Sequence, residues 1–143
     1  MPAPRVIQLG HEAWERIVAH ARADAPLECC GLLVGSGDVV VRAVPTRNLD
    51  ASRVRYTLDP QAYLAAERDG RETGQGVIGA YHSHPSAAPV PSATDLAEGV
   101  DAPFVYVIAG PLDGDRVPEL RAWEKRGGVF AELTLRRGAV TGE

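Results

Sequence analysis

The feature that most constrains the fold is a buried strand that ends in two histidines and a proline. Residues 77–81 are apolar, aromatic or small and predict a strand over residues 77–82, and Pro85 ends it because proline cannot donate to a strand ladder. Side chains two positions apart in a strand lie on one face, so His82 and His84 present two imidazoles to one point. The sequence therefore predicts a sheet with a polar site at a strand end.

A carboxylate completes a set of metal-ligating residues. Asp95 comes after a proline-rich loop and lies in the first turn of a short helix predicted over residues 92–99. Two neutral nitrogens and one carboxylate oxygen suit Zn²⁺, and three protein ligands leave the fourth position open for water. We predict that His82, His84 and Asp95 bind a zinc ion at a catalytic site.

Two further residues suit hydrolysis at such a site. Ser92 lies three positions before Asp95 on the same helix face, so its hydroxyl is placed to donate to an oxyanion. Glu28 begins an apolar strand, a poor place for a carboxylate without a role, and it is the candidate general base. Taken singly, each feature also has a structural explanation: exposed histidines, a helix cap at Ser92, or a solvated Glu28.

The remaining pattern predicts a mixed α/β or α+β architecture. Apolar periodicity predicts a helix over residues 11–23, with His11 and His20 at its surface, and Asp59-Pro60 begins a second helix that stops near Gly74. The predicted strands cover residues 29–34 and 39–44 as a hairpin, 54–58, 104–109, and 119–124 and 129–135 as a final antiparallel hairpin.

Composition limits the remaining classes. The 143 residues fit one domain, 1–143, and 45% hydrophobic with 24% charged residues is ordinary for a globular protein. The net charge of -4 argues against a nucleic-acid partner. The N-terminus has no signal-like apolar region, and no stretch approaches the ~18 apolar residues of a membrane span, so we expect a cytoplasmic protein with no membrane partner.

Cys29 and Cys30 are adjacent, and we expect both to be small, partly buried residues of the fold, although a role near the site stays open.

Glu28, His82-x-His84-Pro85 and Ser92-x-x-Asp95 together resemble the JAMM motif of the Jab/MPN (MPN+) metalloprotease domains. The segment from Glu28 to Leu33 is also similar to the family's sequence around its catalytic glutamate. The resemblance implies a cytidine-deaminase-like α/β fold, with a curved mixed β-sheet flanked by helices. It implies Zn²⁺ on the two histidines and Asp95, Glu28 as general acid and base, and Ser92 as oxyanion stabiliser. Deaminases themselves use H-x-E and P-C-x-x-C, which this chain lacks.

Within that family the chain is most similar to compact, stand-alone bacterial members. This resemblance implies hydrolysis after the C-terminal Gly-Gly of a ubiquitin-like sulfur carrier protein, with release of an amino acid such as cysteine. The carrier's tail would lie along a sheet edge, and Arg47, Arg53 and Arg55 are candidate contacts or solvated loop charges. Because family members form dimers, a homodimer stays open. The alternatives are a DNA-repair-associated relative, which usually has an N-terminal DNA-binding module, and a non-catalytic MPN scaffold, which typically lacks one of the five motif residues.

Overall fold

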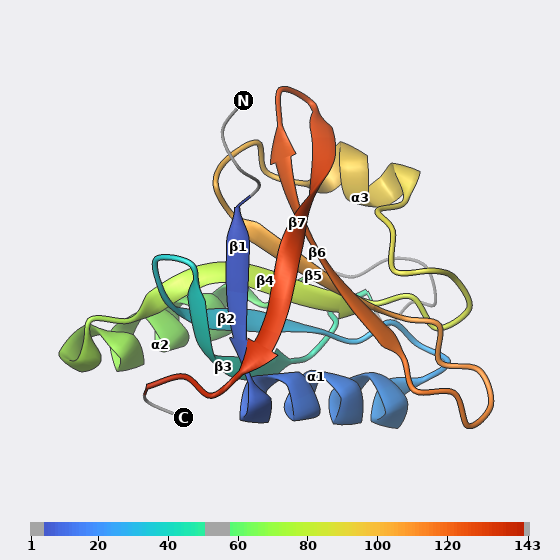
Figure 1. The fold of residues 1–143 in the computed structure, drawn as a ribbon, viewed down its shortest axis with the longest axis horizontal. Coiled ribbons are helices and arrows are strands. Elements are labelled where there is room, and N and C mark those ends of the chain that lie inside the picture. The colour runs from blue at the N-terminus through green and yellow to red at the C-terminus, as the bar shows by residue number, and fades with distance from the viewer. Residues whose placement is uncertain (1–4, 51–57, 142–143) are drawn as a thin grey trace.

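The computed structural model describes residues 5–50 and 58–141. These ranges contain three α-helices, one 3₁₀ helix and seven strands. Figure 1 shows how they are arranged. In chain order they are β1 (Val6–Gly10), α1 (His11–Asp24), β2 (Cys30–Ser36), β3 (Val39–Thr46), α2 (Pro60–Gly70), η1 (Arg71–Thr73), β4 (Gly76–Ser83), α3 (Ala93–Glu98), β5 (Val105–Gly110), β6 (Glu119–Arg126) and β7 (Val129–Gly138).

The strands form one closed sheet in the order β1-β3-β2-β4-β5-β6-β7. β1 runs parallel to both β3 and β7, and β4 runs parallel to β5, whereas the other neighbours are antiparallel. The predicted mixed sheet with flanking helices is therefore present, but β1 was not predicted and it is the strand that closes the sheet. Its five residues pass directly into α1 at His11, without the turn residues that normally mark a strand end.

Helix α1 supplies the main core on one face of the sheet. Ala13, Ile17, Val18 and Ala21 recur at helical spacing and are buried against side chains from β1 to β7. Figure 1 shows α1 lying across the lower end of the strands. The predicted helix over residues 11–23 is confirmed. Its apolar stripe is wide enough to cover a sheet face.

Helix α2 packs against the opposite face of β2 and β4. Leu32 and Val34 of β2 alternate with the residues that face α1, and they contact Ala66 of α2. Asp59 accepts a hydrogen bond from the backbone N–H of Gln61 and caps this helix, as predicted. The C-terminal end of β4, which carries the predicted histidines, is thus held in a sheet that helices cover on both faces.

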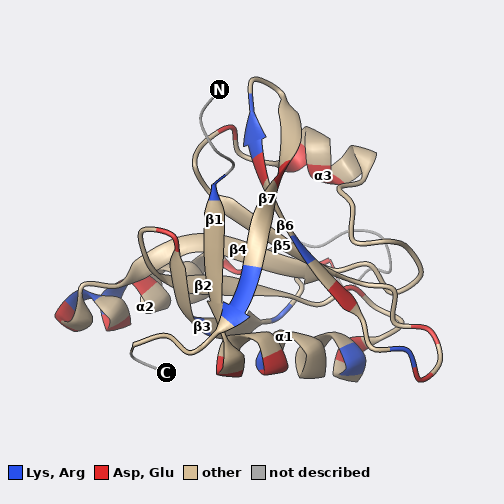
Figure 2. Ribbon diagram, viewed as in Figure 1, with Lys and Arg blue, Asp and Glu red and all other residues tan. Residues whose placement is uncertain are grey.

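Most of the other predicted elements are confirmed to within two residues, including the β2–β3 hairpin. The β6–β7 hairpin is also present, but β7 ends three residues later than predicted. The strand predicted over residues 54–58 falls almost entirely outside the described residues. Figure 2 shows charges of both signs on α1 and α2, and acidic residues on α3. In the described part of the chain, no helix is both long and apolar enough to cross a bilayer.

Candidate metal centre

The side chains of His82, His84 and Asp95 meet at one point. The Nε2 atoms of the two histidines lie 3.3 Å apart. Asp95 Oδ2 lies 3.2 Å from Nε2 of His82 and 3.0 Å from Nε2 of His84. All three side chains are buried. Residues that come from a strand end and from a helix 11 positions further along the chain therefore form one cluster.

The pairing of β4 with its neighbours positions the two histidines. His82 lies opposite Cys30 in β2 and Ile108 in β5. The backbone N–H of His84 donates to the carbonyl of Ala109 at 2.8 Å, which continues the parallel pairing past the end of β4. The Nδ1 atom of His84 donates to the carbonyl of Ala88 at 2.9 Å. This bond fixes the tautomer and leaves Nε2 of His84 available as a ligand.

A helix cap positions Asp95. The Ser92 hydroxyl accepts from the backbone N–H of Asp95 at 3.0 Å, and Asp95 Oδ2 accepts from the backbone N–H of Ser92 at 2.8 Å. These reciprocal bonds form a capping box at the start of α3. The cap uses a lone pair of the Ser92 oxygen and leaves the hydroxyl proton to donate elsewhere. The helix-cap and site interpretations of Ser92 are therefore compatible.

The cluster fits a tetrahedral zinc ion. Bonds of about 2.0–2.1 Å in a tetrahedral site place neighbouring ligand atoms about 3.3 Å apart. The three distances in the cluster are 3.3, 3.2 and 3.0 Å. The donors are two imidazole nitrogens and one carboxylate oxygen, and the three residues form the candidate metal-binding group among the described residues. Both the spacing and the donor chemistry match what a zinc ion requires.

The charges in the cluster are those that a cation needs. Burial alone would raise the pKa of Asp95, but hydrogen bonds from His82 and His84 outweigh it and hold that pKa below its ordinary value. Burial lowers the pKa of His82 and keeps this imidazole neutral. Burial also opposes a charge on His84, yet its bonds to Asp95 and to the Ala88 carbonyl together raise its pKa.

Glu28 lies beside the cluster, just before β2. Two residues later comes Cys30, the strand partner of His82. Glu28 is 4% exposed, and its Oε1 atom has no hydrogen-bond partner among the described residues. Burial raises its pKa to about 7, a shift that the charge on His84 opposes and the charge on Asp95 reinforces. A buried carboxyl that changes charge near neutral pH can both accept and donate a proton.

Two residues that the sequence analysis left without a role hold the Glu28 backbone in place. The Asn48 side chain donates to the Glu28 carbonyl at 3.1 Å. The Ser83 hydroxyl, between the two histidines, accepts from the Cys29 N–H at 2.8 Å. Strand alternation was the available signal for Ser83, because it turns this side chain away from His82 and His84 and toward the start of β2. No pattern in the sequence connects Asn48 with Glu28.

The family follows from a sequence comparison. Residues 11–125 match the model of the prokaryotic homologues of the JAB domain. The chain belongs to the prokaryotic JAB family. The match includes all five motif residues, and it covers α1 through most of β6.

Curated relatives of this JAB protein carry enzyme names. The chain is 38% identical over 136 residues to the desampylase of Haloferax volcanii, covering 90% of this chain and 94% of the relative. It is 33% identical over 118 residues to the CysO-cysteine peptidase of Mycobacterium tuberculosis, covering 81% and 80%. This JAB protein is an enzyme of the same class, a hydrolase of peptide or isopeptide bonds.

Solved structures agree with the fold. A protein from Desulfitobacterium hafniense superposes with a TM-score of 0.84 at 32% identity, covering 95% of each chain. A JAB1/MPN domain protein from Archaeoglobus fulgidus superposes with a TM-score of 0.61 at 21% identity, covering 93% of this chain and 98% of that one. The closed mixed sheet with flanking helices is therefore a JAB/MPN fold.

Other residues singled out in the sequence play structural parts in this JAB protein. Cys29 and Cys30 are free and fully buried, and burial raises the pKa of Cys29 to about 12, so its thiol stays protonated and inert. The surface prediction for His20 is wrong. Its Nδ1 atom lies 2.7 Å from the buried Tyr81 hydroxyl, a polar group that needs a partner inside the core.

Four further residues named in the sequence analysis are exposed or lie outside the described residues. His11 is exposed, as predicted. Arg47 is exposed, whereas Arg53 and Arg55 lie outside the described residues.

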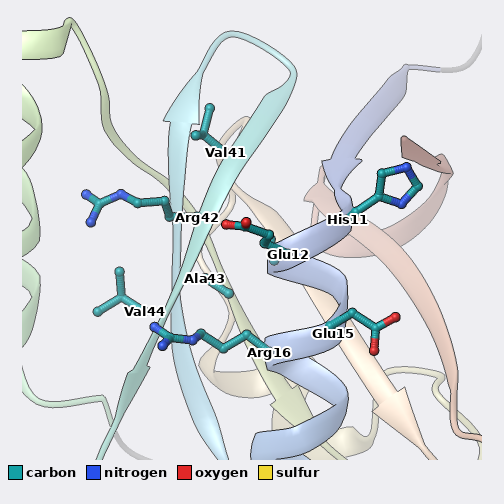
Figure 3. A pocket seen from close by; sticks show the side chains of 9 residues that line it. His11, Glu12, Glu15, Arg16, Val41, Arg42, Ala43 and Val44 are labelled. Carbon is teal, nitrogen blue, oxygen red and sulfur yellow. The ribbon is translucent and has the colours of Figure 1, made fainter. Parts of the chain in front are cut away.

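A separate cleft lies away from the metal-ligating residues. It has a volume of about 690 Å³ and runs between α1 and β3, where Glu12 and Arg16 extend from the helix toward the strand (Figure 3). None of the five motif residues is among the described residues that line it. The perturbed pKa values and the metal-ligating atoms converge instead at the end of β4, which marks the candidate site there.

Proposed function

We propose that this protein is a zinc-dependent peptidase or isopeptidase. Its substrate would be a ubiquitin-like sulfur carrier protein, cut after the C-terminal Gly-Gly to release an amino acid such as cysteine. The observation that carries the proposal is the convergence of three ligand atoms at 3.0–3.3 Å beside the buried Glu28. The names of the relatives, a desampylase and a CysO-cysteine peptidase, support the substrate class.

The five residues divide the chemistry between them. Zinc held by His82, His84 and Asp95 would supply Lewis-acid chemistry for the attack of water. The Glu28 carboxylate takes a proton from this water and passes it to the leaving amine. The C–N bond breaks, the hydroxyl stays on the glycine carbonyl carbon, and the amine leaves with the proton. A pKa of about 7 suits Glu28 to both transfers.

Ser92 acts on the carbonyl oxygen in this scheme. Its hydroxyl accepts from the N–H of Asp95 and keeps a proton to donate. A donor aimed at the oxygen that gains charge lowers the barrier, because the bond strengthens in the transition state. The cap fixes the position of Ser92 before substrate arrives.

The glycine-rich tail would be recognised through its main chain, since glycine offers no side chain. β1 pairs with β3 at Val39 and Val40 only. Beyond these residues, β3 has no strand neighbour on that side within the described part of the chain. This edge runs toward Asn48, which binds the Glu28 carbonyl. An extended tail added to this edge would therefore lead toward the site.

Mass spectrometry of an intact carrier tests the proposal. The substrate is a sulfur carrier with one extra residue after Gly-Gly, incubated with zinc-loaded and chelated protein. Asp95→Ala should lose both bound zinc and activity, because two ligands remain. Glu28→Gln should keep zinc and lose turnover, because this residue is not a ligand. Glu72→Gln, which changes an exposed carboxylate, is the matched control.

The outcomes separate the candidate functions. Cleavage that needs zinc and Glu28 supports the proposal. Stoichiometric zinc without cleavage of any carrier conjugate would favour a binding or scaffold role. Binding of duplex DNA with no carrier cleavage would favour the DNA-repair-associated relative. Protein that binds no zinc would overturn the metal site itself.

Four predictions extend this proposal. The chain would fold as one domain over residues 1–143 with a cytidine-deaminase-like topology, which a single cooperative unfolding transition and an experimental structure would test. It would be cytoplasmic, which fractionation of cells would test. It would be a monomer or a homodimer, which the molecular mass in solution would distinguish.

A further inference from the structure

An apolar pocket of about 280 Å³ adjoins Ser92. We call it the Trp123 pocket. Its wall includes Val90 from the loop before α3, Leu96 from α3, Trp123 from β6, and Val129 and Phe130 from β7. Ser92 belongs to both this wall and the candidate site, so the pocket adjoins the site at this residue.

Hydrogen bonds hold the walls of the Trp123 pocket in place. Trp123 Nε1 donates to the Pro89 carbonyl at 3.0 Å, which fixes the loop before α3. Lys125 Nζ donates to the carbonyls of Leu96 and Gly99 at 2.8 and 3.2 Å, which joins β6 to the end of α3. The pocket is thus formed before any ligand binds, as small-molecule and side-chain sites usually are.

The apolar side chains around the pocket are open to solvent. Val90 is 42% exposed, Leu96 38% and Val129 61%. Single exposed apolar residues are ordinary, but several that share one pocket beside a reacting centre mark a contact surface. The volume is about nine times the ~30 Å³ that a water molecule takes up in the liquid. That space is enough for one large side chain.

The proposed substrate indicates which side chain this is. The two residues before the scissile bond are glycines, so neither can fill a pocket next to Ser92. The residue after the bond is the first one that has a side chain. We infer, on the basis of the proposed function, that the Trp123 pocket binds the side chain of this leaving residue and selects apolar residues over charged ones.

The expected selectivity follows from the apolar wall. A hydrophobic pocket discriminates by roughly 10- to 200-fold for each methylene that it holds. An aspartate at this position would lose its hydration without gaining a hydrogen bond from the wall. We therefore expect kcat/KM for leucine or phenylalanine after Gly-Gly to exceed that for aspartate by at least about tenfold.

A set of matched carriers tests this inference. They differ only in the residue after Gly-Gly, which is leucine, phenylalanine, alanine or aspartate, and they compete in one reaction followed by intact-protein mass spectrometry. Val129→Asp places a charge at the mouth of the pocket, and Leu96→Ser is a second variant in case the first does not fold. Val117→Asp is the control, because Val117 is 72% exposed and does not line the pocket.

The results distinguish the inference from the proposed function. We expect Val129→Asp and Leu96→Ser to reduce kcat/KM for the leucine carrier toward that for the alanine carrier, and to leave the alanine carrier unchanged. Equal rates for all four carriers with wild-type protein would overturn the inference and leave the proposed function standing. Equal loss on every carrier, in variants with wild-type melting temperature, would also overturn it. Failure to cleave any carrier would count against the proposed function instead.

Discussion

Glu28 and Glu124 are both buried carboxylates, 4% and 3% exposed, yet their surroundings differ. Glu124 lies on β6 and accepts hydrogen bonds from Arg5 at 2.8 Å and Arg126 at 2.5 Å. Burial alone would raise the pKa of Glu124, but these bonds outweigh it and lower that pKa. No arginine of the described residues acts on Glu28, and burial raises its pKa to about 7.

The difference shows how burial alone does not define a functional residue. Glu124 is charged and bonded on both oxygens, so it joins β6 to Arg5 before β1 and acts as part of the fold. Glu28 keeps one buried oxygen without a partner among the described residues, and the charges on His84 and Asp95 act on it. A fold does not gain stability from such a carboxyl, and a role in proton transfer explains its presence.

The largest expected effect comes from the two matched amides. Glu28→Gln should reduce kcat by about 10²- to 10⁴-fold, because the amide cannot transfer the proton. Glu124→Gln should leave kcat within about twofold, since it does not face the site, as judged from its partners Arg5 and Arg126. Single-turnover cleavage of the zinc-loaded variants measures both. Normal turnover in Glu28→Gln would show that Glu28 does not transfer the proton.

Ser92 should show the next largest effect, because it both caps a helix and faces the reaction. Ser92→Ala should lower kcat by about 10²- to 10³-fold through loss of a donor. It should also cost about 1 kcal/mol of stability through loss of the cap. Ser92→Thr keeps the hydroxyl and should recover most of the activity. If alanine and threonine variants turned over equally, Ser92 would be a helix cap only.

The sequence predicted the polar centre better than it predicted the fold around it. His82, His84 and Asp95 combine donor types and spacings that have few other uses, so the cluster could be proposed before any coordinates were known. Strand closure by β1 could not be proposed, because parallel pairing with β7 joins residues at opposite ends of the chain and leaves no local pattern.

The surroundings of the site depended on tertiary contacts in the same way. The bond from Asn48 to the Glu28 carbonyl connects positions 20 residues apart. The contact between His20 and Tyr81 joins a helix to a strand 61 residues away. Periodicity reports which face of an element is buried, but not which polar group on another element it will meet.

Stability should depend on pH in opposite directions for the two carboxylates. The pKa of Glu28 is raised from 4.5 to about 7. Its contribution to the free energy of unfolding is therefore fully present below about pH 4.5 and is lost as the pH rises through about 7. The pKa of Glu124 is lowered, so its contribution is present above about pH 4.5 and is lost as pH falls.

Glu28→Gln should therefore stabilise the metal-free protein at pH 8, by up to about 3 kcal/mol, and change little at pH 4. Glu124→Gln should destabilise at pH 8, because the amide loses the ion pairs with both arginines. Urea unfolding in the presence of a chelator at the two pH values measures this. A Glu28→Gln protein that is less stable than wild type at pH 8 would show that the carboxylate is satisfied in the folded state.

The smallest effects separate the two arginines that hold Glu124. Arg5 is 22% exposed and also bonds Asp38, so Arg5→Ala should lower the free energy of unfolding by about 1–3 kcal/mol. Arg126 is 76% exposed, and water can replace it, so Arg126→Ala should cost less than about 1 kcal/mol. Denaturant unfolding measures both, and 0.5 M salt should reduce the effect of Arg126 more than that of Arg5. If the two substitutions lowered the free energy of unfolding equally, the exposed and the less exposed arginine would stabilise Glu124 alike. Glu124 would then differ from Glu28 because it has ion-pair partners, and the burial of those partners would not matter.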